Sequence, residues 1–558
     1  MTEAAAPLPQ TRASLGRWLL PGAIVLAAVI WIFGDLWPAL VEYPASLMPP
    51  FKANLTWATR AIAAVIQLPL TFAFNLLSKG FKIGHGDTAI LLPRLSWLGV
   101  TLVMGWLGYI YGGIRLSLLC GLGFLALALF NLWDNAMLTL ALILICVPFC
   151  VGTGLLIGIL GYFNPRLNQR LITPALDLMQ TMPTFAYLIP MLLLFGASPV
   201  SALLATGFFA TPPMVRATIL GLTKVPSEIA DFADMAGCAK RQKLWRVLIP
   251  SAKPSLMIGV NQVIMLALNM VIISSMIGAG GLGYDVLLAL RALKVGQAME
   301  AGLAIVVIAI VLDRLSPAIA GKGPDSRIAT TRWQRHGNLI IILSILATTT
   351  LLSLFIPALA KLPKDATLTT TYYWKAGVDW IVQNWYDAIE AVRYFILLNF
   401  LNPLRAVFEA LPWFGVLLVL AALAWTLGGA GFAIRITILT WFCAATGLWV
   451  PAMQTLYLCG AAVLVACALG IPLGLWASRS DGFNAFITPI IDGLQTIPSF
   501  CFIIPVVMLF RVGDVTALIA TVAFAIVPSI RYTNHGIRQV PGELVEAGMF
   551  SGPLDVMS

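Results

Sequence analysis

Apolar stretches of membrane-spanning length recur along the chain, separated by short polar segments. They lie near residues 18–37, 95–113, 116–133, 137–160, 178–196, 200–222, 255–277 and 299–318. Each is close to the ~20 residues that a helix needs to cross the ~30 Å hydrocarbon core of a bilayer. Residues 38–93 instead mix charged and apolar side chains, which favours an amphipathic helix at the interface over another crossing. The pattern predicts an all-α, polytopic membrane protein.

The same pattern occurs twice. Residues 172–195, ITPALDLMQTMPTFAYLIPMLLLF, recur as ITPIIDGLQTIPSFCFIIPVVMLF at 487–510, an offset of 315 residues. An even number of predicted spans separates the copies, so they have the same orientation and form parallel tandem repeats. The predicted parts are a first repeat at 1–320 with its core at 137–320, a cytoplasmic linker at 321–337, and a second repeat at 338–558 with its core from 452. The first repeat would contain about eight spans and the second about six.

The second repeat is expected to be truncated. Ser558 aligns with residue 243 of the first repeat, so nothing in the second corresponds to the predicted spans at 255–277 and 299–318. A complete second half would need roughly 80 further residues, because an incomplete repeat leaves helix faces without their partners.

A polar island lies between two predicted spans at Val225–Pro254, VPSEIADFADMAGCAKRQKLWRVLIPSAKP. Pro226 and Ser227 predict the start of a helix, with the Ser227 hydroxyl capping its exposed amides. Glu228 and Asp231 would follow near the positive end of that helix. Apolar residues recur at helical spacing until a glycine interrupts them: Ile229, Phe232, Ala233, Ala236 and Gly237. We predict a short amphipathic helix outside the bilayer that offers its surface to another protein; an ordinary solvated loop is the alternative.

A second copy of this island lies near the end of the chain. Val540–Glu543 aligns with the start of the first island. Three further residues keep the acidic, alanine and glycine spacing of the first copy: Glu546, Ala547 and Gly552. Both repeats are therefore expected to offer a similar helix on the same side of the membrane.

Composition and charge support a membrane protein. Hydrophobic residues make up 60% of the chain and charged residues only 10%, against about 25% charged in a typical soluble domain. The net charge of +10 comes from cations in short loops, which is typical of positive-inside topology and not of nucleic-acid binding. The basic clusters all fall on one side of the predicted spans: Arg115, Arg166 with Arg170, the first island, and the cations of Lys322–Arg335. We therefore predict that the island and the linker are cytoplasmic and that residues 360–375 are periplasmic.

No motif for covalent chemistry or for a bound cofactor is found. The chain has no GxxxxGK[ST] phosphate-binding loop, so ATP hydrolysis would take place on another chain. Gly278–Gly283 has dinucleotide-like glycine spacing, but it follows a predicted helix instead of a strand and is interpreted as a tight turn at a helix end. The eight cysteines contain no CxxC pair and the three histidines are scattered. We expect no metal site, no cofactor and no catalytic residues.

Polar residues and prolines are preserved in both copies at the start of the matched spans. The first copy holds Asp177, Gln180, Thr181 and Pro183, and the second holds Asp492, Gln495, Thr496 and Pro498. The acidic residues suit helix N-termini near the inner interface; a gate or a lining of the transport pathway is the alternative. The prolines predict kinked helices around a cavity.

The first island resembles the EAA loop of bacterial ABC importer permeases. In that family the loop reads Glu-Ala-Ala, three residues, Gly, nine residues and Ile-x-Leu-Pro. Here Asp231-Phe-Ala leads to Gly237 at the same spacing, and Val247–Pro250 follows nine residues later, with Asp and Phe in place of Glu and the first Ala. Residues 137–318 are similar to permeases of the glycine betaine/proline class of type I ABC importers, through QTMPTF at 180–185 and the run MIGAGGLGYDVLLALRALKVGQAMEAGLAIVVIAIVLDRLS at 276–316. Fusion of two copies is a departure, because such subunits usually pair as separate chains.

The resemblance implies the fold, the partners and the function. It implies two tandem copies of the type I ABC importer permease fold in the bacterial inner membrane, a dimer of cytoplasmic ABC ATPases, and a periplasmic binding protein. The binding protein would deliver a small compatible solute such as glycine betaine, choline or proline. ATPase coupling is assigned to two sets of residues: Glu228, Asp231, Ala233, Gly237, Val247 and Pro250 in the first copy, and Glu543, Glu546, Ala547 and Gly552 in the second.

Two other classes of protein compete with this interpretation. A secondary carrier or channel also uses tandem repeats and binding sites near the middle of the membrane, and it is the alternative function. A membrane-embedded enzyme would need a cluster of His, Asp or Ser in the middle of the spans. We find no such cluster in the sequence.

Overall fold

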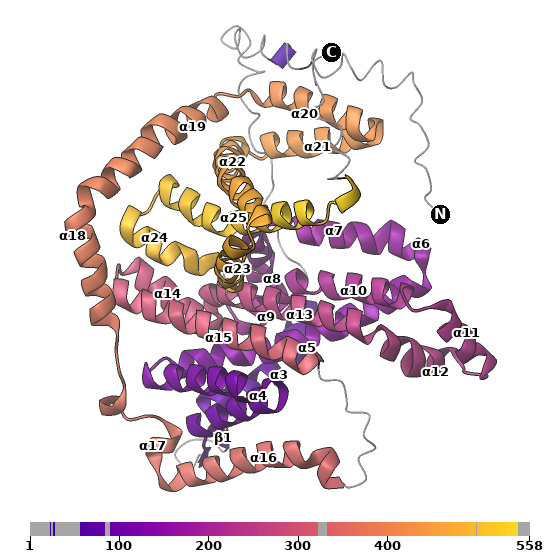
Figure 1. The fold of residues 1–558 in the computed structure, drawn as a ribbon, viewed down its shortest axis with the longest axis vertical. Helices are drawn as coiled ribbons and strands as arrows, with labels where there is room; N and C mark the ends of the chain where they lie inside the picture. Colours follow the sequence, from indigo (N-terminus) through magenta and orange to yellow (C-terminus); the bar gives the residue numbers. More distant parts are fainter. Residues whose placement is uncertain are drawn as a thin grey trace. The chain divides into compact units, whose positions relative to one another are not determined.

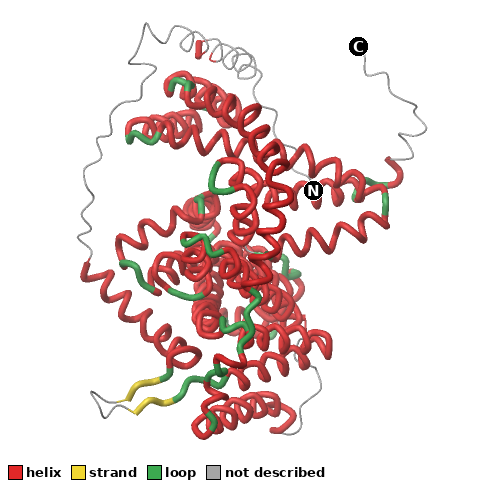
Figure 2. Tube along the Cα trace, turned by 90° about the vertical axis from the view of Figure 1, so that its left-hand side faces the viewer, coloured by secondary structure: helices red, strands yellow, loops and turns green. Residues whose placement is uncertain are grey.

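The computed structural model describes residues 23, 26–27, 56–83, 90–321, 332–497 and 499–544. Almost all of this described part is helical (Figure 1), and the prediction of a helical membrane protein is confirmed. Two short strands, β1 (Phe81–Ile83) and β2 (Ile90–Leu92), pair antiparallel with Phe81 opposite Leu92 (Figure 2), an addition that the apolar pattern does not predict. The predicted span at 18–37 and the predicted linker lie mostly outside the described residues.

The described residues form two compact units. The larger unit contains those of Ala53–Asn384 and Asp492–Met508, and the smaller contains those of Met1–Lys52, Trp385–Ile491 and Leu509–Ser558. Besides the strands, the elements that lie in the larger unit or begin there, with η for π- and 3-10-helical turns, are α3 (Thr56–Phe74), η2 (Asn75–Lys79), α4 (Trp97–Leu129), α5 (Trp133–Phe163), α6 (Pro165–Leu167), η4 (Asn168–Ile172), α7 (Thr173–Thr181), α8 (Thr184–Phe195), α9 (Pro199–Ala210), α10 (Pro212–Thr223), α11 (Ser227–Met235), α12 (Lys240–Gln242), η5 (Lys243–Leu248), α13 (Ile249–Ser274), η6 (Ser275–Ala279), α14 (Leu282–Arg291), α15 (Val295–Gly321), α16 (Arg332–Phe355), α17 (Pro357–Ala360), η7 (Lys364–Ala366), α18 (Thr371–Ile396), η9 (Ser499–Phe502) and α24 (Ile503–Phe510). Those that lie in the smaller unit or begin there are η8 (Leu397–Leu401), α19 (Asn402–Glu409), α20 (Trp413–Gly428), α21 (Ala430–Ala445), α22 (Trp449–Arg479), α23 (Asp481–Thr496) and α25 (Asp514–Arg538).

Nine helices among the described residues are long and apolar enough to cross a bilayer. α5, the α9–α10 pair, α13 and α15 coincide with four of the predicted spans. The prediction of an interfacial helix within residues 38–93 is corrected, because Thr59–Lys79 is a helix of crossing length. Its charged residues, Arg60 and Lys79, lie at the two ends, and no charged residue lies between them. An added crossing there leaves all later loops on the same sides relative to one another.

α4 is a helical hairpin and not one straight helix. Gly113 at its centre has φ +73° and ψ −164°, a backbone conformation that glycine adopts without steric cost. A Cβ added at Gly105 would lie 3.8 Å from the Cα of Gly121, so the two halves of α4 run antiparallel, side by side. The second repeat has the same turn, where Gly429 with φ +75° separates α20 from α21. The two apolar segments predicted on either side of Gly113 are therefore the two arms of this hairpin.

Small residues let the helices of each repeat core approach closely. A Cβ added at Gly158 on α5 would lie only 2.5 Å from the Thr218 Cβ on α10. In the smaller unit, a Cβ added at Gly474 on α22 would lie 2.7 Å from the Thr533 Cβ on α25. Small residues are enriched where membrane helices pack, because dispersion contacts and not water exclusion hold such helices together. The repeat in the sequence is therefore also a repeat of helix packing.

The segment after α16 is bound to the first repeat. Lys361 Nζ lies 3.1 Å from Oδ2 of Asp134 at the start of α5, and Arg94 pairs with the same carboxylate. Trp97 Nε1 donates a hydrogen bond of 2.9 Å to the Ala358 carbonyl. This segment therefore belongs to the same compact unit as the first repeat, although it follows the predicted linker. The repeat boundaries themselves, which rest on sequence comparison, stay a prediction.

Candidate functional site

α11 is the short helix predicted in the first polar island. Its N-terminal cap is Pro226, with φ −54° and ψ 139°, and no side chain caps it. The predicted capping by Ser227 is therefore wrong, because Ser227 already lies in the first helical turn, one position after the cap. Glu228 in that turn is exposed and places a negative charge at the positive end of the helix. Figure 1 shows α11 and α12 projecting beyond the ends of α10 and α13.

Gly237 ends α11 in the way predicted. Its φ of +71° is left-handed. The Cys238 N–H donates to the Ala233 carbonyl and the Gly237 N–H to the Asp234 carbonyl, both at 3.0 Å, which are the two bonds of a Schellman motif. No described atom lies within 4 Å of a Cβ built at Gly237. The backbone, and not packing, therefore requires glycine here.

The chain then returns to α13 through α12 and η5. Lys243 Nζ lies 2.6 Å from Asp234 Oδ2, which ties the returning segment to α11. Leu248 is buried and Val247 half-buried in η5. Pro250 is the second residue of α13, which continues directly from η5. The island is thus a helical hairpin with a defined turn and a packed base.

One face of α11 is apolar and exposed. The predicted apolar stripe divides in the structure: Ala233 is 1% exposed, whereas Phe232 is 68% and Met235 80% exposed. Ile229, three residues before Phe232, is also exposed. We call these three exposed residues, Ile229, Phe232 and Met235, the docking face. Neighbouring large apolar side chains on a projecting helix are typical of a protein-binding surface.

The second predicted coupling segment is described only at its start. α25 ends at Arg538, and Val540 and Glu543 follow it as exposed residues. Three predicted coupling residues lie outside the described residues: Glu546, Ala547 and Gly552. The structure therefore describes the second copy only as far as Leu544.

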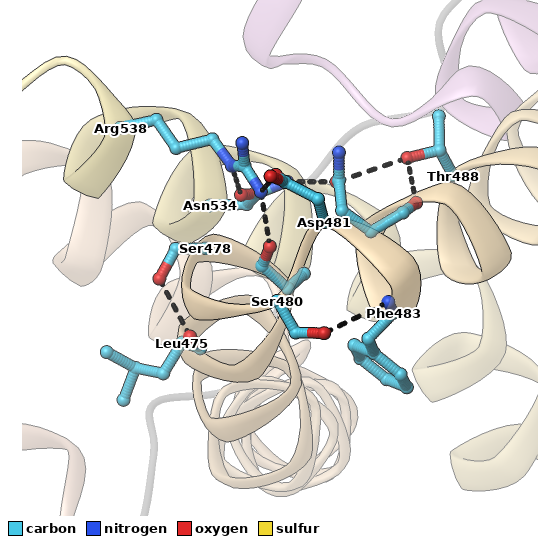
Figure 3. Close-up of polar contacts among 10 residues, drawn as sticks. Leu475, Ser478, Ser480, Asp481, Phe483, Thr488, Asn534 and Arg538 are labelled. Atoms are coloured by element: carbon cyan, nitrogen blue, oxygen red, sulfur yellow. Dashed lines mark hydrogen bonds and ion pairs between the residues drawn. The ribbon is translucent and has the colours of Figure 1, made fainter.

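Arg538 ties three helices together at the base of this second segment (Figure 3). Its Nη2 donates to the Ala477 carbonyl at the end of α22 at 2.9 Å and to Asp481 Oδ1 on α23 at 2.8 Å. Its Nε donates to Asn534 Oδ1 on α25 at 2.9 Å, and the Asn534 amide donates to Asn484 Oδ1 on α23 at 2.8 Å. The guanidinium suits this role because it carries five donors in a fixed plane. Sequence reasoning missed this network, whose members are far apart in the chain.

The kink predicted at Pro183 is a complete break. The helical stretch that ends with α7 is bent by 102° from α8. Met182 has an extended backbone with ψ 133°, because a residue that precedes proline is disfavoured in the α region. The Tyr187 hydroxyl donates to the Met179 carbonyl and satisfies one of the groups that the break leaves free. Pro190 lies inside α8 without interrupting it.

Asp177 on α7 forms an ion pair with Arg216 on α10. Arg216 Nη2 lies 2.5 Å from Asp177 Oδ1, and the two side chains are 48% and 58% exposed, respectively. Gln180 and Thr181 are exposed in the last turn of α7. The structure therefore gathers these polar residues and Pro183 at one helix break, and it adds Arg216, which the sequence reasoning missed.

The second copy keeps the same arrangement along the chain. Asp492 and Gln495 lie near the end of α23, which ends at Thr496. The predicted place of Asp177 and Asp492 at helix N-termini is therefore wrong, because neither lies in the first turn of its helix. Pro498 lies outside the described residues, and so does the side chain of Thr496. Arg531 stands 315 residues after Arg216, the offset that relates Asp492 to Asp177. That repetition is the sequence pattern from which Arg216 could have been found.

The glycine cluster at 278–283 forms the predicted tight turn. Three of its members have positive φ: Gly278, Gly280 and Gly281. α14 begins at Leu282, whose N–H donates to the Thr139 hydroxyl at 3.1 Å. Burial raises the pKa of the Asp285 carboxyl on α14, although the Asn135 amide donates a hydrogen bond of 2.5 Å to it. Within the described ranges no three metal-ligating side chains gather.

Residues 150–362 and 470–552 match a protein family described as binding-protein-dependent transport system inner membrane component. The trimethylamine N-oxide transport system permease protein TmoV of Pelagibacter ubique is 36% identical over 83% of this chain and 65% of its own length, so the chain spans just under two thirds of that relative. TmoV of Ruegeria pomeroyi is 32% identical over 97% of this chain and 83% of its own length. The glycine betaine/proline betaine transport system permease protein ProW of Escherichia coli is 40% identical over 52% of this chain and 82% of its own length.

Proposed function

The chain belongs to the family of binding-protein-dependent transport system inner membrane components, and from that premise we propose that it is the membrane-spanning subunit of an ATP-driven importer of small methylated amines. It is a multi-pass protein of the bacterial inner membrane. Its partners are a pair of cytoplasmic ATPase subunits and a periplasmic protein that binds the solute. ATP is hydrolysed on the ATPase subunits, and this chain converts their movement into alternating access across the membrane.

The docking face of α11 is the observation that carries this proposal. The side chains of Phe232 and Met235 project from a helix whose end is fixed by Gly237 and whose return is tied by Lys243 to Asp234. A rigid projecting helix with an apolar face suits insertion into a groove of another protein. Such a helix transmits a push or a pull to α10, which ends at Thr223 just before it, and to α13, which it reaches through α12 and η5.

The solute is proposed to be trimethylamine N-oxide, glycine betaine or a close analogue. The names of the similar permeases refer to these two compounds and to proline betaine, all small molecules with a fully substituted nitrogen and no net charge. Aromatic side chains in the periplasmic binding protein would recognise the cationic nitrogen. The membrane subunit then needs a polar pathway but no charged binding site of its own, in keeping with spans whose charged residues lie mainly near their ends.

Loss of the docking face tests the proposal. Phe232→Asp should prevent the ATPase from co-purifying with this chain, because burial of a phenylalanine side chain contributes about 2 kcal/mol, roughly a 30-fold change in affinity. ATP-dependent uptake of labelled trimethylamine N-oxide and glycine betaine into cells that contain all subunits should fall with it. Leu368→Asp, at an exposed leucine in the segment predicted to be periplasmic, is the matched control and should keep both properties.

Three results would contradict parts of the proposal. Normal ATPase capture and uptake by Phe232→Asp would argue that α11 is only a connector. Uptake into vesicles driven by an ion gradient without ATP would favour a secondary carrier. Normal ATPase capture without ATP-dependent uptake of either labelled amine by the native subunits would leave the importer class in place and overturn the solute.

A further inference from the structure

The ion pair between Asp177 and Arg216 joins two helices at a place where membrane proteins rarely carry charge. Arg216 lies seven residues before Thr223, the last residue of α10, which places it about 10 Å inside the end of that helix. α9 and α10 together form a candidate membrane span, and α7 belongs to a broken one. The pair is therefore not part of a solvated loop.

Both side chains are partly exposed in the larger unit. An ionised side chain that faces lipid at this depth is energetically costly, and such residues almost always face a water-filled cavity or other protein. The pair thus lies on the surface that borders the solute pathway or another part of the protein, and not on the lipid-facing surface. A pair in that position can open and close without exposing a charge to hydrocarbon.

The two helices that the pair joins are those that connect the docking face to the broken span. α10 ends at Thr223, and α11 begins at Ser227 only a short turn later. Asp177 lies in α7, which ends at the break formed by Met182 and Pro183. A displacement of α11 therefore reaches α10 along the chain. The ion pair then transmits it from Arg216 on α10 to Asp177 on α7, which is 39 residues away in the sequence and leads to the break.

The second repeat carries the same two residue types at the equivalent positions, Asp492 and Arg531. Several of their sequence neighbours repeat as well: Gln180 as Gln495, Pro213 as Pro528 and Thr218 as Thr533. The two charges are therefore among the residues that both repeats keep.

We propose that Asp177 and Arg216 form a latch that couples the movement of α11 to the break at Pro183. The latch rests on the proposed function, because α11 moves only if an ATPase is docked on it. Both residues are positioning residues: they hold α7 to α10 and need not touch the solute. When the latch is broken, the ATPase still docks and hydrolyses ATP, but the break no longer follows α11.

The test measures solute imported per ATP hydrolysed, with the chain, its ATPase and its binding protein reconstituted together in vesicles. Asp177→Asn and Arg216→Gln should each lower this ratio about tenfold while hydrolysis stays within about twofold of the native rate. The amount of each variant in the membrane is measured beside the ratio, because removal of one partner leaves the other charge unpaired within a candidate span. The double variant Asp177→Arg with Arg216→Asp should restore the ratio to within about threefold, because a directly interacting pair is non-additive. Lys361→Gln breaks a similarly exposed pair outside α7 and α10 and should leave the ratio unchanged.

The outcomes separate the latch from the proposed function. Capture of the ATPase together with a native ratio in both single variants would overturn the latch alone. A charge-swapped chain that is present in the membrane and captures the ATPase, but imports no better than the single variants, would also overturn it. Failure of the native chain to capture any ATPase would overturn the proposed function and the latch with it.

Discussion

Pro226 and Gly237 define the two ends of α11 through backbone conformation. Pro226 stands at the cap without a side-chain hydrogen bond, and Gly237 takes the left-handed conformation that closes a Schellman motif. The short helix between them has few internal hydrogen bonds, so its direction depends on these two positions. Single residues far from any solute therefore control how the docking face is presented.

Substitution of Gly237 separates this backbone requirement from packing. Gly237→Ala should lower capture of the ATPase about tenfold, because a left-handed residue with a Cβ costs about 1–2 kcal/mol, while the amount of chain in the membrane stays constant. Gly237→Asn should be milder, since asparagine tolerates this conformation. Gly377→Ala is the control: nothing lies within 4 Å of a Cβ there either, but Gly377 lies within α18 and has no positive φ. Equal effects at the two glycines would refute the backbone explanation.

Individual residues differ in how far the sequence could predict them. Gly237 and Pro183 were predictable because their roles depend on their own backbone angles and on adjacent residues. Ser227 was assigned to the cap because proline and serine are both common at helix starts, and the structure shows that proline took the cap position. Arg216 and Arg538 bind partners 39 and 61 residues away, and such contacts depend on how distant helices pack.

At the scale of elements, the predicted span at 178–196 is divided between the end of α7 and the apolar helix α8. The sequence predicts a kink there, and the structure has a bend of 102° with Met182 extended before Pro183. The segment at Thr59–Lys79 was misinterpreted because its charged residues, Arg60 and Lys79, were interpreted as part of a mixed charged and apolar sequence. In the structure they lie at the two ends of one helix of crossing length. Element type was predictable from composition, whereas bends and exact ends required local backbone detail.

Removal of the proline at the break should straighten it. Pro183→Ala frees Met182 to enter the helical region and restores a backbone donor, so α7 and α8 should become more continuous. We expect a fall in uptake of about tenfold or more, with normal ATPase capture and a normal amount of chain in the membrane. Pro190→Ala, within α8, is the matched control, because α8 already continues through that position. Greater loss of uptake in Pro190→Ala than in Pro183→Ala would contradict this account.

At the scale of the whole molecule, the tandem repeat was the most predictable feature. Residues that the sequence repeat aligns have the same contacts and turns in both copies. Gly158 packs on Thr218 as Gly474 packs on Thr533, and Gly113 and Gly429 each form a turn with positive φ. The compact units were not predictable in the same way, because the segment that follows α16 is bound to Asp134 and Trp97 of the first repeat. Homologous sequence marks equivalent helices, but side-chain contacts decide which segments cluster.

The hairpins centred on Gly113 and Gly429 have a consequence for the surrounding lipid. α20 and α21 contain 16 residues each, about 24 Å of helix, and the arms of α4 are of similar length. A hydrocarbon core of ~30 Å exceeds this, so lipids beside both hairpins must compress or tilt, a hydrophobic mismatch. Import per ATP should therefore be highest in vesicles of short acyl chains and should fall as the chains lengthen, with capture of the ATPase unchanged. An importer built in this way would respond to the thickness of the membrane that contains it.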